Sequence, residues 1–299
     1  MHGNKENVNN EKLVTMVTRS FKFEQKKKGN IKIEMEWENW EEWDPSLLLP
    51  TTERKEGEMV LKTDLVIGTE DFNEEQLYEK GKEYHEDGRT DYAISCISRS
   101  IKLNPTAEKW HLLGMIYQQA VDSDSHAVSA FLEAIKMDSN HPARIDLAVS
   151  HYNNLNESEG KEEVVKFLES HRSFKMLSSD EKRGKNTGEI FKMCVEKCPS
   201  DHLLWCAFGV WHILTDSQGT AAVECYKKAL ALQPDNAFLH CKIAGILTNE
   251  SSPVEAIEHY IAAFKLRPIY PRCSTNLGIL HYKSSPMLFL ESLLEAISL

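Results

Sequence analysis

The chain has 299 residues and a formal net charge of -11, and 41% of its residues are hydrophobic. That length and apolar content suffice for one large or two ordinary domains with a sizeable core. The acidic balance argues against a nucleic-acid partner, because phosphate neutralisation needs clustered Lys and Arg and the largest basic run is only Lys26 to Lys28. No apolar run approaches the ~20 residues that a membrane-spanning helix needs.

The seven cysteines are odd in number and scattered over helical pattern, without a Cys-x₂-Cys pair or a secretory signal peptide. This usage is typical of a reduced, intracellular protein. Cys194 and Cys198, with His202 nearby, could bind a metal, but we interpret them as a semi-buried thiol pair on a packing face. We therefore predict no metal site and no cofactor.

The first 70 residues show neither helical nor strand periodicity over a useful length, and they change from Lys-rich to Glu-rich midway. We predict that residues 1–70 are largely disordered. One acidic motif contains Trp37, Trp40 and Trp43 at every third residue. On a helix this spacing gathers the indole rings along one edge, which suits docking into an apolar groove of a partner. The alternative is that the tryptophans fold back on the rest of the chain.

A 34-residue unit is written twice in succession between Leu203 and His281. The copies share a pattern of small residue, aromatic, alanine and proline, at Ala222, Tyr226, Ala229 and Pro234 and again at Ala256, Tyr260, Ala263 and Pro268. A period of this length with this pattern is the tetratricopeptide signature, a helix-turn-helix unit.

Three further units precede this pair. The first predicts helices near 74–87 and 90–103. The second places Trp110, Gly114, Tyr117 and Phe131 at consensus offsets, and the third starts at His141. After residue 171 the pattern breaks, so we predict a loop over 171–187 and a helix near 188–198.

These observations predict an all-α tetratricopeptide-repeat solenoid of about six to seven units behind the disordered segment. The repeats form two blocks, residues 72–170 and 201–299, which an irregular segment over 171–200 connects. The first helix of each unit should line the inner wall, where a ligand is most expected. The repeats contain no recognisable catalytic constellation, so we predict that the protein is not an enzyme.

Runs in both blocks depart from a generic repeat, and they comprise 232–249 and 267–279 in the second block and 110–114 and 146–153 in the first. They resemble the peroxisomal import receptor family that binds type 1 targeting signals. The resemblance covers about residues 75–298 and includes the break between the blocks. It implies a ring-like funnel around a cargo C-terminus of Ser-Lys-Leu type.

The resemblance also implies a peptide-binding site. Asparagine side chains can pair the peptide's backbone amides, and its carboxylate needs a cation. The matching positions are Asn153, Asn249 and Asn276 for the backbone, Arg272 and Lys242 for the carboxylate, and Tyr260 for the last apolar side chain. The alternative for each asparagine is a turn or helix-end residue that bonds its own backbone.

Three positions depart from the family pattern. Cys241 and Lys283 stand where the family carries asparagine, and Ala120 stands where a polar contact is expected. Each lost amide pairing costs about 1 kcal/mol, so three losses would weaken binding by about two decades. The chain also lacks the family's N-terminal cysteine, its Trp-x₃-Phe/Tyr motifs and the helical segment after the last repeat. A short paralogue, a divergent receptor and an incomplete sequence remain alternatives.

We therefore expect a cytosolic receptor that carries peroxisomal matrix proteins to the peroxisomal membrane and cycles between the two. Trp37, Trp40 and Trp43 are candidate contacts for docking proteins at that membrane. The alternative is a scaffold or co-chaperone that binds another protein's C-terminus, such as an acidic chaperone tail. That mode needs several cations on one first-helix face, whereas the first unit offers only Lys80 and Lys82.

Overall fold

A computed structural model describes residues 22–26, 30–34, 72–120, 124–215, 219–250, 252–267 and 269–283. The chain divides into two units, residues 1–58 and 59–299, and each is considered by itself. The tryptophan motif, at Trp37, Trp40 and Trp43, lies outside the described residues.

The described part of the first unit is a β-hairpin of β1 (Lys22–Lys26) and β2 (Asn30–Glu34). The antiparallel register pairs Phe23 with Ile33, Lys22 with Glu34 and Glu24 with Lys32. The sequence predicts no strand periodicity in this region. Each of the two strands has only five residues, which is too short for a clear periodic pattern.

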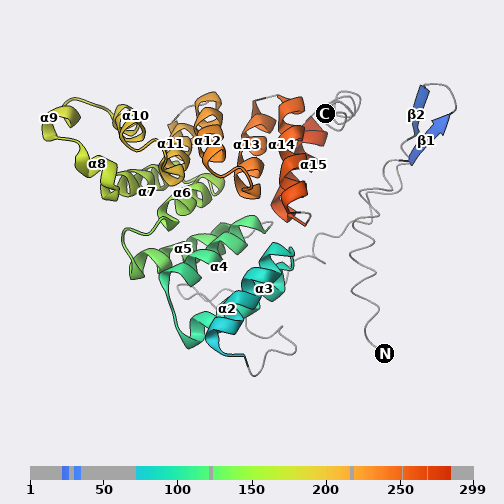
Figure 1. Cartoon of the computed structure of the whole chain (residues 1–299), viewed down its shortest axis with the longest axis horizontal. Coiled ribbons are helices and arrows are strands. Elements are labelled where there is room, and N and C mark those ends of the chain that lie inside the picture. The colour runs from blue at the N-terminus through green and yellow to red at the C-terminus, as the bar shows by residue number, and fades with distance from the viewer. Residues whose placement is uncertain are drawn as a thin grey trace. The chain divides into compact units, whose positions relative to one another are not determined.

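The described residues from 72 to 283 form helices and their connections (Figure 1). The helices are α2 (Glu74–Glu86), α3 (Thr90–Leu103), α4 (Ala107–Gln119), α5 (Asp124–Met137), α6 (Ala143–Asn153), α7 (Glu157–Ser170), α8 (Arg172–Met176), α9 (Ser179–Lys182), α10 (Thr187–Lys197), α11 (His202–Thr215), α12 (Thr220–Leu232), α13 (Ala237–Asn249), α14 (Pro253–Leu266) and α15 (Pro271–Lys283).

The helices pack as consecutive pairs, α2 with α3, α4 with α5, α6 with α7, α11 with α12 and α13 with α14. Within the described residues, α15 follows these pairs as the first helix of a further unit. Each pair also contacts the next, and this includes α7 with α11, although α8, α9 and α10 lie between these two helices in the sequence. This arrangement is a tetratricopeptide-type helical solenoid, which confirms the predicted fold class. The described helices contain none that is long and apolar enough to cross a membrane.

Small residues on the first helix of a unit allow its second helix to approach closely. A Cβ added to Gly81, Gly114 or Gly209 would lie 2.4, 2.4 or 2.9 Å from the side chain of Ile97, Phe131 or Tyr226, respectively. Real Cβ atoms are almost never found so close to another heavy atom, so these positions require glycine. Ile97, Phe131 and Tyr226 are themselves buried, and each belongs to the core of its unit.

We expect Gly114→Ala to destabilise the repeat array, because the new methyl group would overlap the Phe131 ring. Overpacking lowers the free energy of unfolding by about 1–3 kcal/mol, whereas the higher helix propensity of alanine raises it by about 1 kcal/mol. Gly278→Ala is the matched control, since the glycine lies in α15 with no other group within 4 Å of the added Cβ. Urea unfolding followed by circular dichroism should show a lower midpoint for Gly114→Ala and an equal or higher one for Gly278→Ala. A lower midpoint in both variants would contradict this explanation.

The connecting segment differs from its predicted form. Residues 171–187 were predicted as a loop, but they contain the short helices α8 and α9. Ser178 and Glu181 form a capping box at the start of α9, and Asn186 and Glu189 form another at the start of α10. Such boxes satisfy the free amides of a helix start and are readable from sequence. The predicted helix near 188–198 is confirmed as α10.

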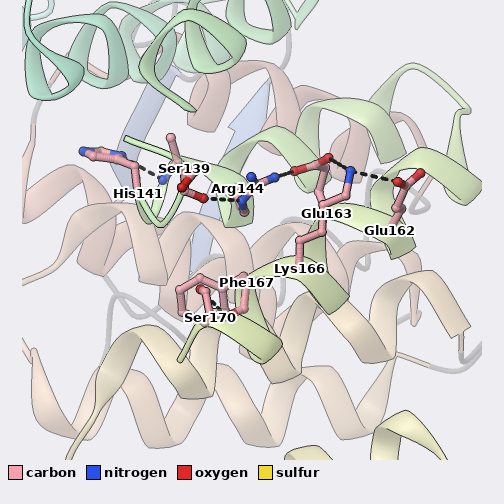
Figure 2. A network of polar contacts seen from close by, with 9 residues as sticks. Ser139, His141, Arg144, Glu162, Glu163, Lys166, Phe167 and Ser170 are labelled. Carbon is pink, nitrogen blue, oxygen red and sulfur yellow. Dashed lines mark hydrogen bonds and ion pairs between the residues drawn. The ribbon is translucent and has the colours of Figure 1, made fainter. Parts of the chain in front are cut away.

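A polar network joins α6 to α7 in the third unit (Figure 2). Arg144 forms an ion pair with Glu163, and its Nε donates to the carbonyl oxygen of Ser139 over 3.0 Å. Lys166 then bridges Glu163 and Glu162 at 2.9 and 2.8 Å. The side chains of Arg144 and Glu163 are each only 12% exposed. Helix pairing in this unit therefore depends on a buried ion pair as well as on apolar contacts.

Candidate functional site

Charged side chains gather where the first helices of several units face one another. His111 on α4 lies 2.9 Å from the carboxylate of Asp146 on α6. The Asp146 charge also acts on Cys206 of α11 and on Lys242 of α13. First helices from both blocks therefore share one electrostatic environment, which we call the inner-wall cluster: His111, Asp124, Asp146, Lys242 and Arg272.

Lys242 is the cation of this cluster whose ammonium group could pair with an incoming anion. Its ammonium lies over the Phe238 ring, 4.8 Å from the centroid. Among the described residues it has no carboxylate partner within ion-pair distance. Burial lowers the pKa of Lys242, and the charges of Asp146 and Asp124 offset this only in part. A desolvated cation without a close partner gains most from an incoming anion.

Arg272 lies in the same cluster but already has partners. Its Nε donates to the Gln118 carbonyl oxygen at 3.0 Å, and its Nη2 donates to the Ala120 carbonyl at 3.2 Å and to Asp124 Oδ2 at 2.9 Å. Resemblance to the receptor family assigns this arginine to a ligand carboxylate. In the structure its N–H groups instead donate hydrogen bonds to acceptors in the first repeat block.

Asn153 meets the same aspartate, because its Nδ2 donates to Asp124 Oδ1 over 3.0 Å. Asp124 thus joins two residues predicted for the site, Asn153 and Arg272, that are more than a hundred positions apart in the chain. Sequence reasoning missed Asp124 because it is the first residue of α5, directly after the variable turn between α4 and α5. It also missed Asp146, although that residue occupies a first helix of the third unit, where a groove-facing side chain was expected.

The other predicted residues occupy different environments. Asn276 is half-buried on α15, and its Nδ2 lies 3.4 Å from the Cβ position of Gly245 on α13. Asn249 is the exposed last residue of α13. Tyr260 is fully buried, and its hydroxyl lies 3.0 Å from Thr248 Oγ1. Tyr260 therefore belongs to the packed core of its unit.

The three departures from the family pattern also have structural outcomes. Cys241 is only 3% exposed, and its thiol interacts with Cys273 and Tyr270 inside the second block. Ala120 does supply a polar contact, because its backbone carbonyl accepts from Arg272. The Lys283 side chain lies outside the described residues. Cys241 is therefore a core residue rather than a poor substitute for a groove asparagine.

A second arginine also crosses between the blocks. Arg267, at the end of α14, donates to the His85 carbonyl oxygen and to Gln119 Oε1, and its Nη2 lies 3.2 Å from His85 Nδ1. Burial and the neighbouring Arg267 charge lower the pKa of His85 to about 3, so this imidazole is neutral at physiological pH. A neutral imidazole can accept from the guanidinium. The first and last described units are therefore in direct contact.

A serine, a histidine and an aspartate meet in the connecting segment. Ser173 Oγ lies 2.7 Å from His171 Nδ1, and His171 Nε2 lies 3.1 Å from Asp201 Oδ2. The backbone N–H of Ser173 also donates to His171 Nδ1, which makes the imidazole a cap for α8. Ser173 is completely buried, so its hydroxyl is out of reach of a substrate. This constellation fastens α8 to the start of α11 rather than forming a nucleophile.

Cys194 and Cys198 are both buried, and all seven cysteines are free thiols. His202 Nε2 lies 3.0 Å from the side-chain amide of Gln233. Within the described residues, no group of three or more His, Cys, Asp or Glu side chains has the arrangement of a metal site.

No family model matches the chain. A stretch of 57 residues is 35% identical to the peroxisomal targeting signal receptor of Candida albicans, and it covers 19% of this chain and 10% of the relative. A stretch of 70 residues is 30% identical to the photosystem I assembly protein Ycf3 of Synechococcus elongatus, covering 22% and 40%. The chain therefore spans between a tenth and two fifths of the length of these curated relatives.

Solved helical-repeat structures resemble this chain at lower sequence identity than the curated relatives do. A thermophilic TPR protein of Thermus thermophilus is 18% identical with a TM-score of 0.44, over 74% of this chain and all of that chain. The MamA protein is 14% identical with a TM-score of 0.33, over 65% of this chain and 92% of that chain. The fold assignment stands on the helix pairs of the chain itself.

Proposed function

We propose that the inner wall binds the C-terminal peptide of another protein, and that the peptide is a peroxisomal targeting signal of Ser-Lys-Leu type. The observation that carries the proposal is Lys242 on α13, a desolvated cation that has no carboxylate within ion-pair distance in the part of the chain that the structure describes. A peptide carboxylate would supply the missing anion. Helical-repeat solenoids bind proteins on this wall, which makes a peptide a suitable ligand.

The neighbouring groups suit the rest of such a peptide. The Asn276 amide offers a donor and an acceptor for backbone groups, and it has no hydrogen-bond partner among the described residues. Asp146 and Asp124 place negative charge beside Lys242. A lysine next to the peptide's C-terminus would be attracted by these carboxylates. The short match to a peroxisomal targeting signal receptor supports the same ligand.

In this role the protein is a cytosolic receptor that carries peroxisomal matrix proteins to the peroxisomal membrane and cycles back. The alternative is a scaffold or co-chaperone that binds an acidic C-terminus. The same two carboxylates disfavour that alternative, because Asp124 and Asp146 are largely buried and would repel an acidic tail.

Fluorescence anisotropy with labelled peptides tests the proposal. A peptide ending in Ser-Lys-Leu with a free carboxylate should bind saturably, with a Kd in the roughly micromolar to nanomolar range. The same peptide with an amidated C-terminus should bind at least about tenfold more weakly, because the charge that pairs with Lys242 is lost. Equal binding of the two forms, or tighter binding of a peptide ending in Glu-Glu-Val-Asp, would overturn it.

A further inference from the structure

The contact between the two repeat blocks depends on two arginines. Arg267 and Arg272 flank the turn between α14 and α15, and both reach the first block. Their acceptors lie at helix ends: the His85 carbonyl in the last turn of α2, the Gln118 and Ala120 carbonyls at the end of α4, and Asp124 at the start of α5.

The nature of these acceptors explains why the two residues that connect the blocks, Arg267 and Arg272, are cations. The last carbonyl groups of a helix have no partner within the helix, and they carry the negative end of its dipole. Arg272 satisfies such carbonyls at the end of α4, and Arg267 does so at the end of α2. The planar guanidinium offers several donors in a fixed geometry, which lets one side chain serve two or three acceptors.

Apolar packing contributes less to this contact. Ile269 approaches Gly88, where an added Cβ would lie 2.4 Å from the isoleucine side chain, and Gly88 has a left-handed φ of +71°. Ile269 is nevertheless 46% exposed. Among the described residues, the junction therefore combines charge-assisted hydrogen bonds with one half-exposed aliphatic side chain. Salt screens such bonds where their charges are accessible to solvent, and the Arg272 side chain is 25% exposed, whereas salt does not screen an apolar interface.

We propose that Arg267 and Arg272 form an electrostatic latch that holds the first and last repeats together and opens when its charges are screened or removed. Opening releases Asp124 from Arg272 and frees the Arg272 guanidinium, whereas the bond from Asn153 to Asp124 stays within the first block. If the wall binds a peptide as proposed above, the latch also controls access to it. The latch itself does not depend on that function.

Energy transfer between fluorophores on the full chain measures the latch without any ligand. The dyes are attached through non-natural amino acids at positions 79 on α2 and 258 on α14, both exposed, so that the native cysteines stay unlabelled. The double substitution Arg267→Gln and Arg272→Gln removes both charges and keeps polar side chains. Arg183→Gln is the matched control, because the Arg183 side chain is 83% exposed.

We expect transfer efficiency to fall in the double variant and to stay at the wild-type level in the control. In the wild type it should also fall as NaCl rises from about 0.1 M to about 1 M, where the Debye length shortens from about 10 Å to about 3 Å. Far-UV circular dichroism verifies that the double variant keeps its helices. A helical double variant with wild-type transfer efficiency would overturn the proposal, as would a wild type whose efficiency is unchanged by salt. Neither outcome involves the peptide, so failure of the latch and failure of the proposed function are separate results.

Discussion

Lys242→Met is expected to weaken binding of a peptide ending in Ser-Lys-Leu by roughly tenfold to 150-fold. A hydrogen bond to a charged group contributes about 1.5–3 kcal/mol, and each 1.4 kcal/mol is about a factor of ten in Kd. The effect should lie at the upper end of this range, because the ammonium is partly desolvated and has no competing ion pair among the described residues. Methionine keeps most of the length and apolar volume of the lysine stem, so the substitution tests the charge rather than the packing.

The pH dependence of binding provides a second readout of the same lysine. Burial lowers the pKa of Lys242 from the ordinary 10.5, so its charge is lost at a lower pH than that of an exposed lysine. Only the protonated form attracts a carboxylate. Affinity should therefore be constant at neutral pH and decline as pH rises through this lowered pKa. A bound carboxylate favours the ammonium, so peptide binding in the alkaline range should take up protons.

Lys265→Met is the matched control, since Lys265 is an exposed lysine near the end of α14. Anisotropy titrations of the three proteins at several pH values separate the possibilities. The control should bind like the wild type at every pH, and the alkaline decline should disappear with Lys242→Met. If Lys242→Met and Lys265→Met bound equally well, the carboxylate would have to lie elsewhere in the groove.

The repeat period was sufficient to predict the helix pairs, because each unit satisfies its own packing rules. Helices predicted near 74–87 and 90–103 match α2 (Glu74–Glu86) and α3 (Thr90–Leu103) within a residue. Close approach requires small residues such as Gly114 in a first helix and a buried aromatic such as Phe131 in the second, and both are visible in the sequence. Tyr260 occupies the repeated aromatic position, and the structure buries it fully in the core of its unit.

The contacts between blocks could not be predicted in this way. Arg272 and Asp124 are 148 residues apart in sequence. Whether they meet depends on the sum of small rotations from one unit to the next, which no single repeat encodes. The sequence therefore predicted that Arg272 is a groove cation, but it could not assign its partner. Lys242 and Asn153 were predicted for the same site, and the structure places both in the electrostatic surroundings of Asp124.

Glu163→Ala is expected to destabilise the protein by about 3 kcal/mol, the largest stability effect that we predict. Glu163 is the ion-pair partner of Arg144, and both side chains are nearly buried (Figure 2). Breaking a buried pair by removing one member costs about 3–5 kcal/mol, because the remaining charge stays desolvated. The Ser139 carbonyl still accepts from Arg144, which keeps the expected cost at the lower end.

Glu162→Ala is the matched control within the same network. Glu162 contacts Lys166 at 2.8 Å, but its side chain is 65% exposed. An exposed pair contributes about 0–1 kcal/mol, so this variant should unfold close to the wild type. Urea unfolding followed by circular dichroism gives both values. Equal losses in the two variants would mean that burial does not set the strength of this network.

Replacing both Arg144 and Glu163 separates two quantities. One is the net contribution of the ion pair to stability, and the other is the cost of leaving one buried charge without its partner. In the double variant Arg144→Met and Glu163→Leu, neither charge remains in the interior, and apolar side chains fill similar space. Replacing a buried pair in this way is often neutral or stabilising. We therefore expect the double variant to be more stable than Glu163→Ala alone, with a non-additive coupling of about 0.5–3 kcal/mol. The stability lost by the double variant is compared with the losses in the single variants Arg144→Met and Glu163→Leu. A double variant that lost the sum of these two would show that Arg144 and Glu163 stabilise α6 and α7 independently. The junction in the third unit would then depend on packing, and the ion pair would contribute little to it.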